Sequence, residues 1–133
     1  MGQVRGFLPQ RWPSWFAPEL IDLAPNAFGP FPGSFKVTRA GDVIVVPTSG
    51  HTDAHVSVVV QDSDRTYFLA GDASYTQRFM LDQQIDGVAL DAQAARQTLQ
   101  RIRQFAQSTP MVYLPTHDPA SGDRVVSKSI VTF

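Results

Sequence analysis

Two short apolar runs on either side of a polar turn constrain the fold of this chain more than any other feature. Residues 56–60 and 66–70 are rich in β-branched and aromatic side chains, which favour strands. The residues between them, 61–65, read Gln-Asp-Ser-Asp-Arg and are typical of a turn. The pattern predicts two antiparallel neighbouring strands, and their apolar composition predicts burial on both faces.

A helix and another strand are predicted to follow. Asp91 is a suitable N-cap for a helix that ends at 108–110. Its apolar residues recur at helical spacing: Ala92, Ala95, Leu99, Ile102 and Ala106. Residues 111–114 then read as a buried strand. A strand, a helix and a strand in this order indicate a crossover between parallel strands, so we expect an α/β fold with a mixed sheet and covering helices.

The segments before and after this unit have weaker patterns. Residues 34–39 and 43–47 predict a further hairpin, and residues 74–81 a short helix. The tail, residues 122–133, shows weak alternation. Residues 1–33 hold six of the ten prolines and six large aromatic side chains, which predicts an irregular arm. This arm either covers an edge of its own domain or forms a wall of a binding site.

Length and charge narrow the possible functions. The chain has 133 residues, which is typical of one domain or less, so we treat 1–133 as a single partial domain. Charged residues make up 17%, below the roughly 25% of soluble domains, which suggests that a partner covers part of the surface. The net charge of -1 argues against nucleic-acid and anionic-membrane binding. Apolar runs are too short for a signal peptide or membrane span, so we expect a cytoplasmic protein.

The predicted topology gathers three chemically capable side chains. His55 precedes one strand of the central hairpin and Asp72 follows the other, so antiparallel pairing places both at one edge of the sheet. His117 follows a strand that runs parallel to 66–70 and therefore emerges at the same edge. Because the chain has no cysteine, a metal site has to use such ligands. Two imidazoles and a carboxylate suit Zn²⁺, and also Fe²⁺ or Mn²⁺, with positions left open for water.

Structural roles for these residues stay open at this point. A single His is more often a hydrogen-bonded structural group than a ligand. Asp72 could cap the helix that follows it. His51, in a Gly-His-Thr turn, is expected only to tie down its loop. Asp118 could orient a ligand or be a solvated loop carboxylate.

Three segments resemble, in order and spacing, the carboxyl-terminal motifs of metallo-β-lactamase-fold hydrolases. They are Thr-Ser-Gly-His-Thr-Asp-Ala-His ending at His55, Gly-Asp-Ala-Ser-Tyr ending at Tyr75, and Pro-Thr-His-Asp ending at Asp118. The Asp-Ala-Ser-Tyr string and the proline-rich aromatic arm are most similar to the N-acyl-homoserine-lactone lactonase branch. The resemblance implies half of an αββα sandwich.

The resemblance also implies roles for the site residues. His55 would bind one zinc ion, His117 would bind a second, and Asp72 would bridge the two. Tyr75 would polarise the lactone, which makes Tyr75 and Asp72 the candidate catalytic residues. A tyrosine at a helix start that merely packs on the arm is the alternative for Tyr75.

The chain departs from the family pattern in its first part. The first metal motif, His-x-His-x-Asp-His, should lie upstream, yet the chain has three histidines and none precedes His51. Asp53 and Ala54 also replace the usual Pro-Gly. The chain therefore resembles a truncated, carboxyl-terminal half in which each metal keeps two ligands, too few for a tight site.

Two functions remain as expectations. The first is a zinc-dependent hydrolase of small lactone or ester substrates, of the quorum-quenching kind, inactive without a complementary N-terminal half. The second is a non-catalytic remnant or assembly module that associates with itself or another chain through an exposed half-sheet.

Overall fold

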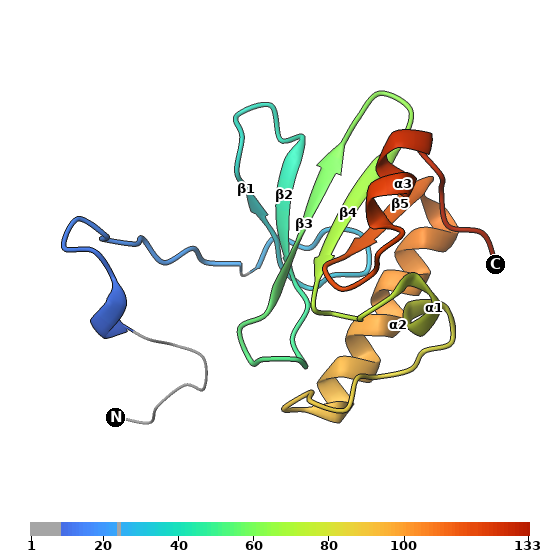
Figure 1. Cartoon of the computed structure of the whole chain (residues 1–133). Coiled ribbons are helices and arrows are strands. Elements are labelled where there is room, and N and C mark those ends of the chain that lie inside the picture. The colour runs from blue at the N-terminus through green and yellow to red at the C-terminus, as the bar shows by residue number, and fades with distance from the viewer. Residues whose placement is uncertain (1–8, 24) are drawn as a thin grey trace.

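The computed structural model describes residues 9–23 and 25–133 and contains a five-stranded mixed sheet (Figure 1). The strands are β1 (Phe35–Lys36), β2 (Val43–Pro47), β3 (Val56–Gln61), β4 (Thr66–Gly71) and β5 (Met111–Pro115). They lie in the order in which they occur in the sequence. The pairs from β1 to β4 are antiparallel, and β5 is parallel to β4. The predicted α/β fold with a mixed sheet is confirmed.

The helices are η1 (Pro9–Arg11), α1 (Gln77–Leu81), α2 (Ala92–Ser108) and α3 (Ser121–Ser127). The helix α2 makes the predicted crossover between β4 and β5. Asp91 caps it as expected, because its side chain accepts hydrogen bonds from the N–H groups of Gln93 and Ala94. Within the part of the chain that the structure describes, no helix has the length and apolar character needed to span a bilayer.

One face of the sheet forms the core. A cross-strand row on this face consists of Ile44, Val59, Phe68 and Tyr113, each at most 2% exposed. Leu99, Ile102 and Phe105 of α2 belong to the same buried cluster. Phe31 joins the cluster and stacks on Phe68 with a ring distance of 5.8 Å. The amphipathic helix α2 thus closes this face.

The opposite face of the sheet is open. Its matching cross-strand row consists of Val45, Val58, Leu69 and Leu114. Leu69 remains 43% exposed, and Val56 on the same strand as Val58 remains 37% exposed. The expectation that both central strands are buried on two faces is therefore wrong. Side chains alternate between the faces of a sheet, and α2 covers one of them.

A shallow groove of about 530 Å³ lies over this open face. Its apolar lining includes Val58, Leu69 and Leu114, and Val125 of α3 borders it. The groove also includes Gly71 and Thr116, at the carboxyl ends of β4 and β5. The open apolar surface is thus continuous with the edge of the sheet where the predicted site lies.

Two short segments differ from the predictions. The helix α1 begins at Gln77 and not at Ser74, because Thr76 is its N-cap and accepts the N–H of Phe79. Asp72 therefore does not cap it. The tail forms the helix α3, where the weak alternation from 122 onward gave no sign of one. The guanidinium of Arg124 fixes α3 to the sheet by donating to the carbonyl of Tyr113 at 3.0 Å.

Residues 9–22 extend away from the sheet, as Figure 1 shows. Trp12 and Phe16 pack edge to face with a ring distance of 4.7 Å, and Trp15 contacts Phe16 at 6.2 Å. Trp15 is 79% exposed. Residues 1–8 and 24 of the predicted arm lie outside the described residues, and the division of the chain into an arm and a partial domain stays a prediction.

The two faces predict losses of stability of different size for neighbouring substitutions. We expect Phe68→Ala to lower the free energy of unfolding by about 3–5 kcal/mol, because the ring is fully buried. Leu69→Ala on the open face should cost less than about 2 kcal/mol. Urea denaturation of both variants measures the difference. Equal losses would mean that Leu69 is covered in solution.

Candidate metal centre

Parallel pairing of β4 and β5 brings Asp72 and His117 together. Gly71 pairs with Pro115, and the N–H of Thr116 donates to the carbonyl of Gly71 at 3.0 Å. The residues that follow β4 and β5 therefore leave the sheet at the same end. His117 Nε2 lies 3.3 Å from Asp72 Oδ1. The structure therefore places these two predicted site residues side by side.

His51 is a member of the cluster that sequence reasoning missed. Its Nε2 lies 3.5 Å from Asp72 Oδ2, the carboxylate oxygen that does not face His117. The expectation that His51 only ties down its loop was too narrow. The signal that could have found it is its place in the same Gly-His-Thr motif as His55.

The loop that carries His51 is held against the start of α2. The N–H of Asp91 donates to the carbonyl of Gly50 at 3.1 Å, and the Thr98 hydroxyl donates to the carbonyl of Ser49 at 2.7 Å. Gly50 has a φ of 141°, and a Cβ there would lie 2.5 Å from the Cα of Ala95. Only glycine fits this close approach between the loop and the helix.

His55 is hydrogen-bonded to the backbone of Asp72 and to Thr48. Its Nε2 accepts a hydrogen bond from the N–H of Asp72 at 3.1 Å. Its Nδ1 lies 2.8 Å from the hydroxyl oxygen and 3.1 Å from the carbonyl oxygen of Thr48. Burial lowers the pKa of His55, which keeps the ring neutral. Both ring nitrogens therefore have protein partners, and this arrangement does not match the expected role of His55 as a metal ligand.

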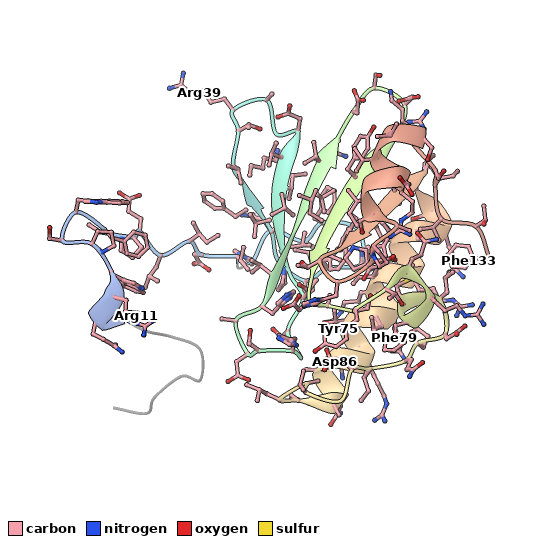
Figure 2. The ribbon with its side chains drawn as sticks, viewed as in Figure 1. Arg11, Arg39, Tyr75, Phe79, Asp86 and Phe133 are labelled. Carbon is pink, nitrogen blue, oxygen red and sulfur yellow. The ribbon has the colours of Figure 1, made fainter. Side chains whose placement is uncertain are left out.

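Tyr75 lies beside His117 at the same end of the sheet (Figure 2). The two rings meet edge to face with a centroid distance of 4.9 Å. Desolvation, and then the charges of Asp86 and Asp72, raise the pKa of Tyr75 above its ordinary value of 10.0. The phenol is therefore protonated at neutral pH and can donate a hydrogen bond.

Asp118 fixes the loop that carries His117. Its side chain is 9% exposed and forms an ion pair of 2.7 Å with Arg124. It also accepts the N–H groups of Gln77 at 2.9 Å and Ala120 at 3.0 Å. Burial acts to raise the pKa of Asp118, but the hydrogen bonds from Gln77 and Arg124 prevail and lower it. The alternative of a solvated loop carboxylate is wrong.

The donor chemistry of the cluster fits metal ions, but the number of donors is small. Each oxygen of Asp72 faces one imidazole Nε2, and nitrogen and oxygen donors suit Zn²⁺. In residues 9–23 and 25–133, no group of three or more His, Cys, Asp or Glu side chains is arranged to hold a metal ion. The described residues therefore bring together one carboxylate and two imidazoles, with one imidazole at each oxygen of Asp72.

The sequence profile of the metallo-beta-lactamase superfamily matches residues 4–117. The chain belongs to this superfamily. Among curated proteins, none matches the sequence.

Several solved structures share the fold. An N-acyl homoserine lactone hydrolase, with the product N-hexanoyl-L-homoserine bound at its catalytic metal centre, superposes with a TM-score of 0.60 and 21% identity. The match covers 70% of this chain and 36% of that one. A quorum-quenching N-acyl homoserine lactone lactonase gives 0.59 and 21%, over 75% and 40% of the two chains.

A probable metal-dependent hydrolase from Staphylococcus aureus gives a TM-score of 0.56 and 17% identity, over 66% of this chain and 31% of that one. At such identities the similarity shows the fold alone. This chain thus spans 31–40% of the length of these proteins.

The contact between Gly50 and α2 predicts a costly substitution. We expect Gly50→Ala to lower the free energy of unfolding by about 2 kcal/mol or more, because the new Cβ meets Ala95 and the backbone is strained. Gly122→Ala in α3 is the control, since a Cβ there meets nothing within 4 Å. Thermal denaturation compares the two, and equal stability of both variants would contradict the tight fit at Gly50.

The neutral state of His55 predicts acid sensitivity of the metal-free chain. Burial lowers the pKa of folded His55 below its ordinary value of 6.5, so the unfolded state binds more protons as the pH falls. This contribution destabilises the fold progressively below about pH 6.5, down to the folded-state pKa. The variant His55→Gln keeps an acceptor for the N–H of Asp72 but cannot titrate.

We therefore expect His55→Gln to lose less stability than the unchanged chain between about pH 7.5 and about pH 5.5. Urea denaturation at each pH measures the two slopes. His51 and His117 are present in both proteins, so the difference reports His55. Parallel slopes would show that His55 is not held neutral.

Proposed function

We propose that this chain contributes the carboxyl-terminal part of a metal-dependent hydrolase that opens lactones or related esters. The observation that carries the proposal is the carboxylate of Asp72 with one imidazole facing each of its oxygens. This cluster lies at the carboxyl ends of β4 and β5, in a chain of the metallo-beta-lactamase superfamily, and beside the protonated phenol of Tyr75.

His51, Asp72 and His117 are the residues that we propose as ligands, with His51 in the place first expected for His55. The hydrogen bonds of His55 support this exchange, because its Nε2 is engaged by the N–H of Asp72. Zinc suits these donors, and iron or manganese would also accept them. Bound ions of this kind supply hydroxide near neutral pH and polarise carbonyl groups.

The proposed part of Tyr75 is to orient the substrate. Its raised pKa keeps the hydroxyl protonated, so it can donate a hydrogen bond to the carbonyl oxygen of a lactone. Negative charge develops on that oxygen during attack, and a fixed donor stabilises it. The edge-to-face contact with the ring of His117 limits the orientations of the phenol.

The open groove supports a partner that completes the site. Gly71 and Thr116 line the groove and are the direct neighbours in sequence of Asp72 and His117. A second sheet packed on this face would therefore reach the cluster and could add ligands to it. The occupant that we propose is an N-terminal half of a superfamily domain carrying His-x-His-x-Asp-His.

The exposed face also favours a second candidate function. An assembly module would use the same groove to bind a second copy of the chain, with no role for the cluster. Leu69 and Val125, 43% and 45% exposed, would be buried in either case. Chemistry at Asp72 is what separates the two functions.

The split site predicts little activity from the chain alone. We expect weak zinc binding and no hydrolysis of N-acyl homoserine lactones, because each ion finds two donors. Adding the N-terminal half of a superfamily member that carries His-x-His-x-Asp-His should bring tight zinc binding and turnover. Zinc content and lactone hydrolysis measure both. Absence of zinc and turnover in a stable, complete assembly would contradict the hydrolase, and self-association alone would favour the module.

A matched pair of variants separates the two histidines of one motif. In the completed assembly, His51→Ala should remove zinc and turnover, whereas His55→Gln should retain zinc because its amide still accepts the N–H of Asp72. Zinc is quantified after dialysis, and circular dichroism confirms that each variant is folded. If His55→Gln loses zinc and His51→Ala retains it, then His55 and not His51 is the ligand.

A further inference from the structure

Asp86 is a buried carboxylate that the proposed chemistry does not use. It lies in the segment between α1 and α2, and its side chain is 3% exposed. Isolated buried carboxylates are costly, so those that persist are paired or hydrogen-bonded. The partners of Asp86 therefore indicate what it does.

The two oxygens of Asp86 have different partners. Oδ2 lies 3.3 Å from Nδ1 of His51, and Oδ1 accepts the N–H of Val88 at 2.9 Å. The other nitrogen of His51, Nε2, faces Asp72 at 3.5 Å. The imidazole of His51 thus spans two carboxylates, one buried and one at the open edge of the sheet.

Backbone contacts hold the two segments in this arrangement. The N–H of Leu90 donates to the carbonyl of His51 at 3.4 Å, and the N–H of Asp91 donates to the carbonyl of Gly50 at 3.1 Å. The segment with Asp86 is therefore attached to the loop with His51 at two further points. Figure 2 shows Asp86 at the same end of the sheet as Tyr75.

We propose that Asp86 is a positioning residue that selects the tautomer of His51. Its carboxylate accepts the proton on Nδ1, which leaves the lone pair of Nε2 directed toward Asp72. An imidazole with a free Nε2 lone pair can bind a metal ion, and a carboxylate behind it fixes the ring and raises its basicity. The metal-binding consequence rests on the proposed function, whereas the tautomer does not.

The variant Asp86→Asn separates this role from that of a turn residue. Asparagine has the same shape, and its oxygen can still accept the N–H of Val88. Its amide, however, presents an N–H group to Nδ1 of His51, which favours the opposite tautomer with the proton on Nε2. A residue that only caps the turn would leave the tautomer of His51 unchanged.

The first measurement uses the metal-free full chain and nitrogen NMR of the histidine rings at alkaline pH, where imidazoles are neutral. We expect His51 protonated on Nδ1 in the unchanged protein and on Nε2 in Asp86→Asn. Protonation on Nε2 in the unchanged protein would overturn the proposal by itself, whether or not the variant folds. The same tautomer in both folded proteins would also overturn it.

The second measurement titrates zinc alone into the same proteins and follows the histidine signals. We expect Asp86→Asn to weaken zinc binding by about 10-fold to 100-fold. The control is Asp82→Asn, whose exposed carboxylate pairs with Arg78 and should not change zinc binding. Unchanged zinc affinity in a folded Asp86→Asn variant would overturn the positioning role.

The two measurements separate the two proposals. If no protein binds zinc, even in the completed assembly, but the tautomer depends on Asp86, the metal site fails and the control of His51 by Asp86 is supported. If zinc binds equally to all variants and the tautomer does not change, Asp86 has no positioning role and the metal site is supported.

Discussion

Parallel pairing of β4 with β5 is the contact on which the candidate site depends. It ends with Gly71 opposite Pro115, so Asp72 and His117 leave the sheet at neighbouring points. Hydrogen bonds of Asp118 to α1 and of Arg124 to β5 then fix the loop beyond it. The chain can therefore hold two groups that are 45 residues apart in sequence within 3.3 Å of each other. The sheet pairing and these hydrogen bonds therefore order the site locally.

Hydrogen bonding at the second nitrogen decides what each imidazole can do. His51 and His55 are four residues apart in one motif, and their rings lie 6.1 Å apart. His55 uses both nitrogens to join Thr48 to the N–H of Asp72, which is a structural role. His51 has the buried carboxylate of Asp86 at Nδ1, and its Nε2 faces the carboxylate of Asp72. Both residues are histidines of one motif, so the difference between their roles arises from their hydrogen-bond partners.

The elements that local sequence could predict are those whose pattern repeats over several residues. The central hairpin, the helix capped by Asp91 and the parallel strand that follows it are of this kind, and together they predict that Asp72 and His117 converge. The contact of Asp86 with His51 joins residues 35 apart through an irregular segment, for which no period or strand register exists. The strand pattern alone could not predict the open face, because an apolar strand looks the same whether or not its second face has a partner; only the resemblance to half of a sandwich implied it.

The open face and the cluster of His51, Asp72 and His117 are parts of one surface, which would link the energetics of assembly to the proposed chemistry. The groove runs over apolar side chains that remain partly exposed and includes Gly71 and Thr116 beside the cluster. Burial of such side chains is worth about 25 cal/mol for each Å² of apolar area, so a partner sheet would gain most of its binding energy away from the site. Ligands carried by that sheet would be positioned by apolar packing before any ion binds. A superfamily domain divided at this face would therefore couple completion of the metal site to closure of the sandwich.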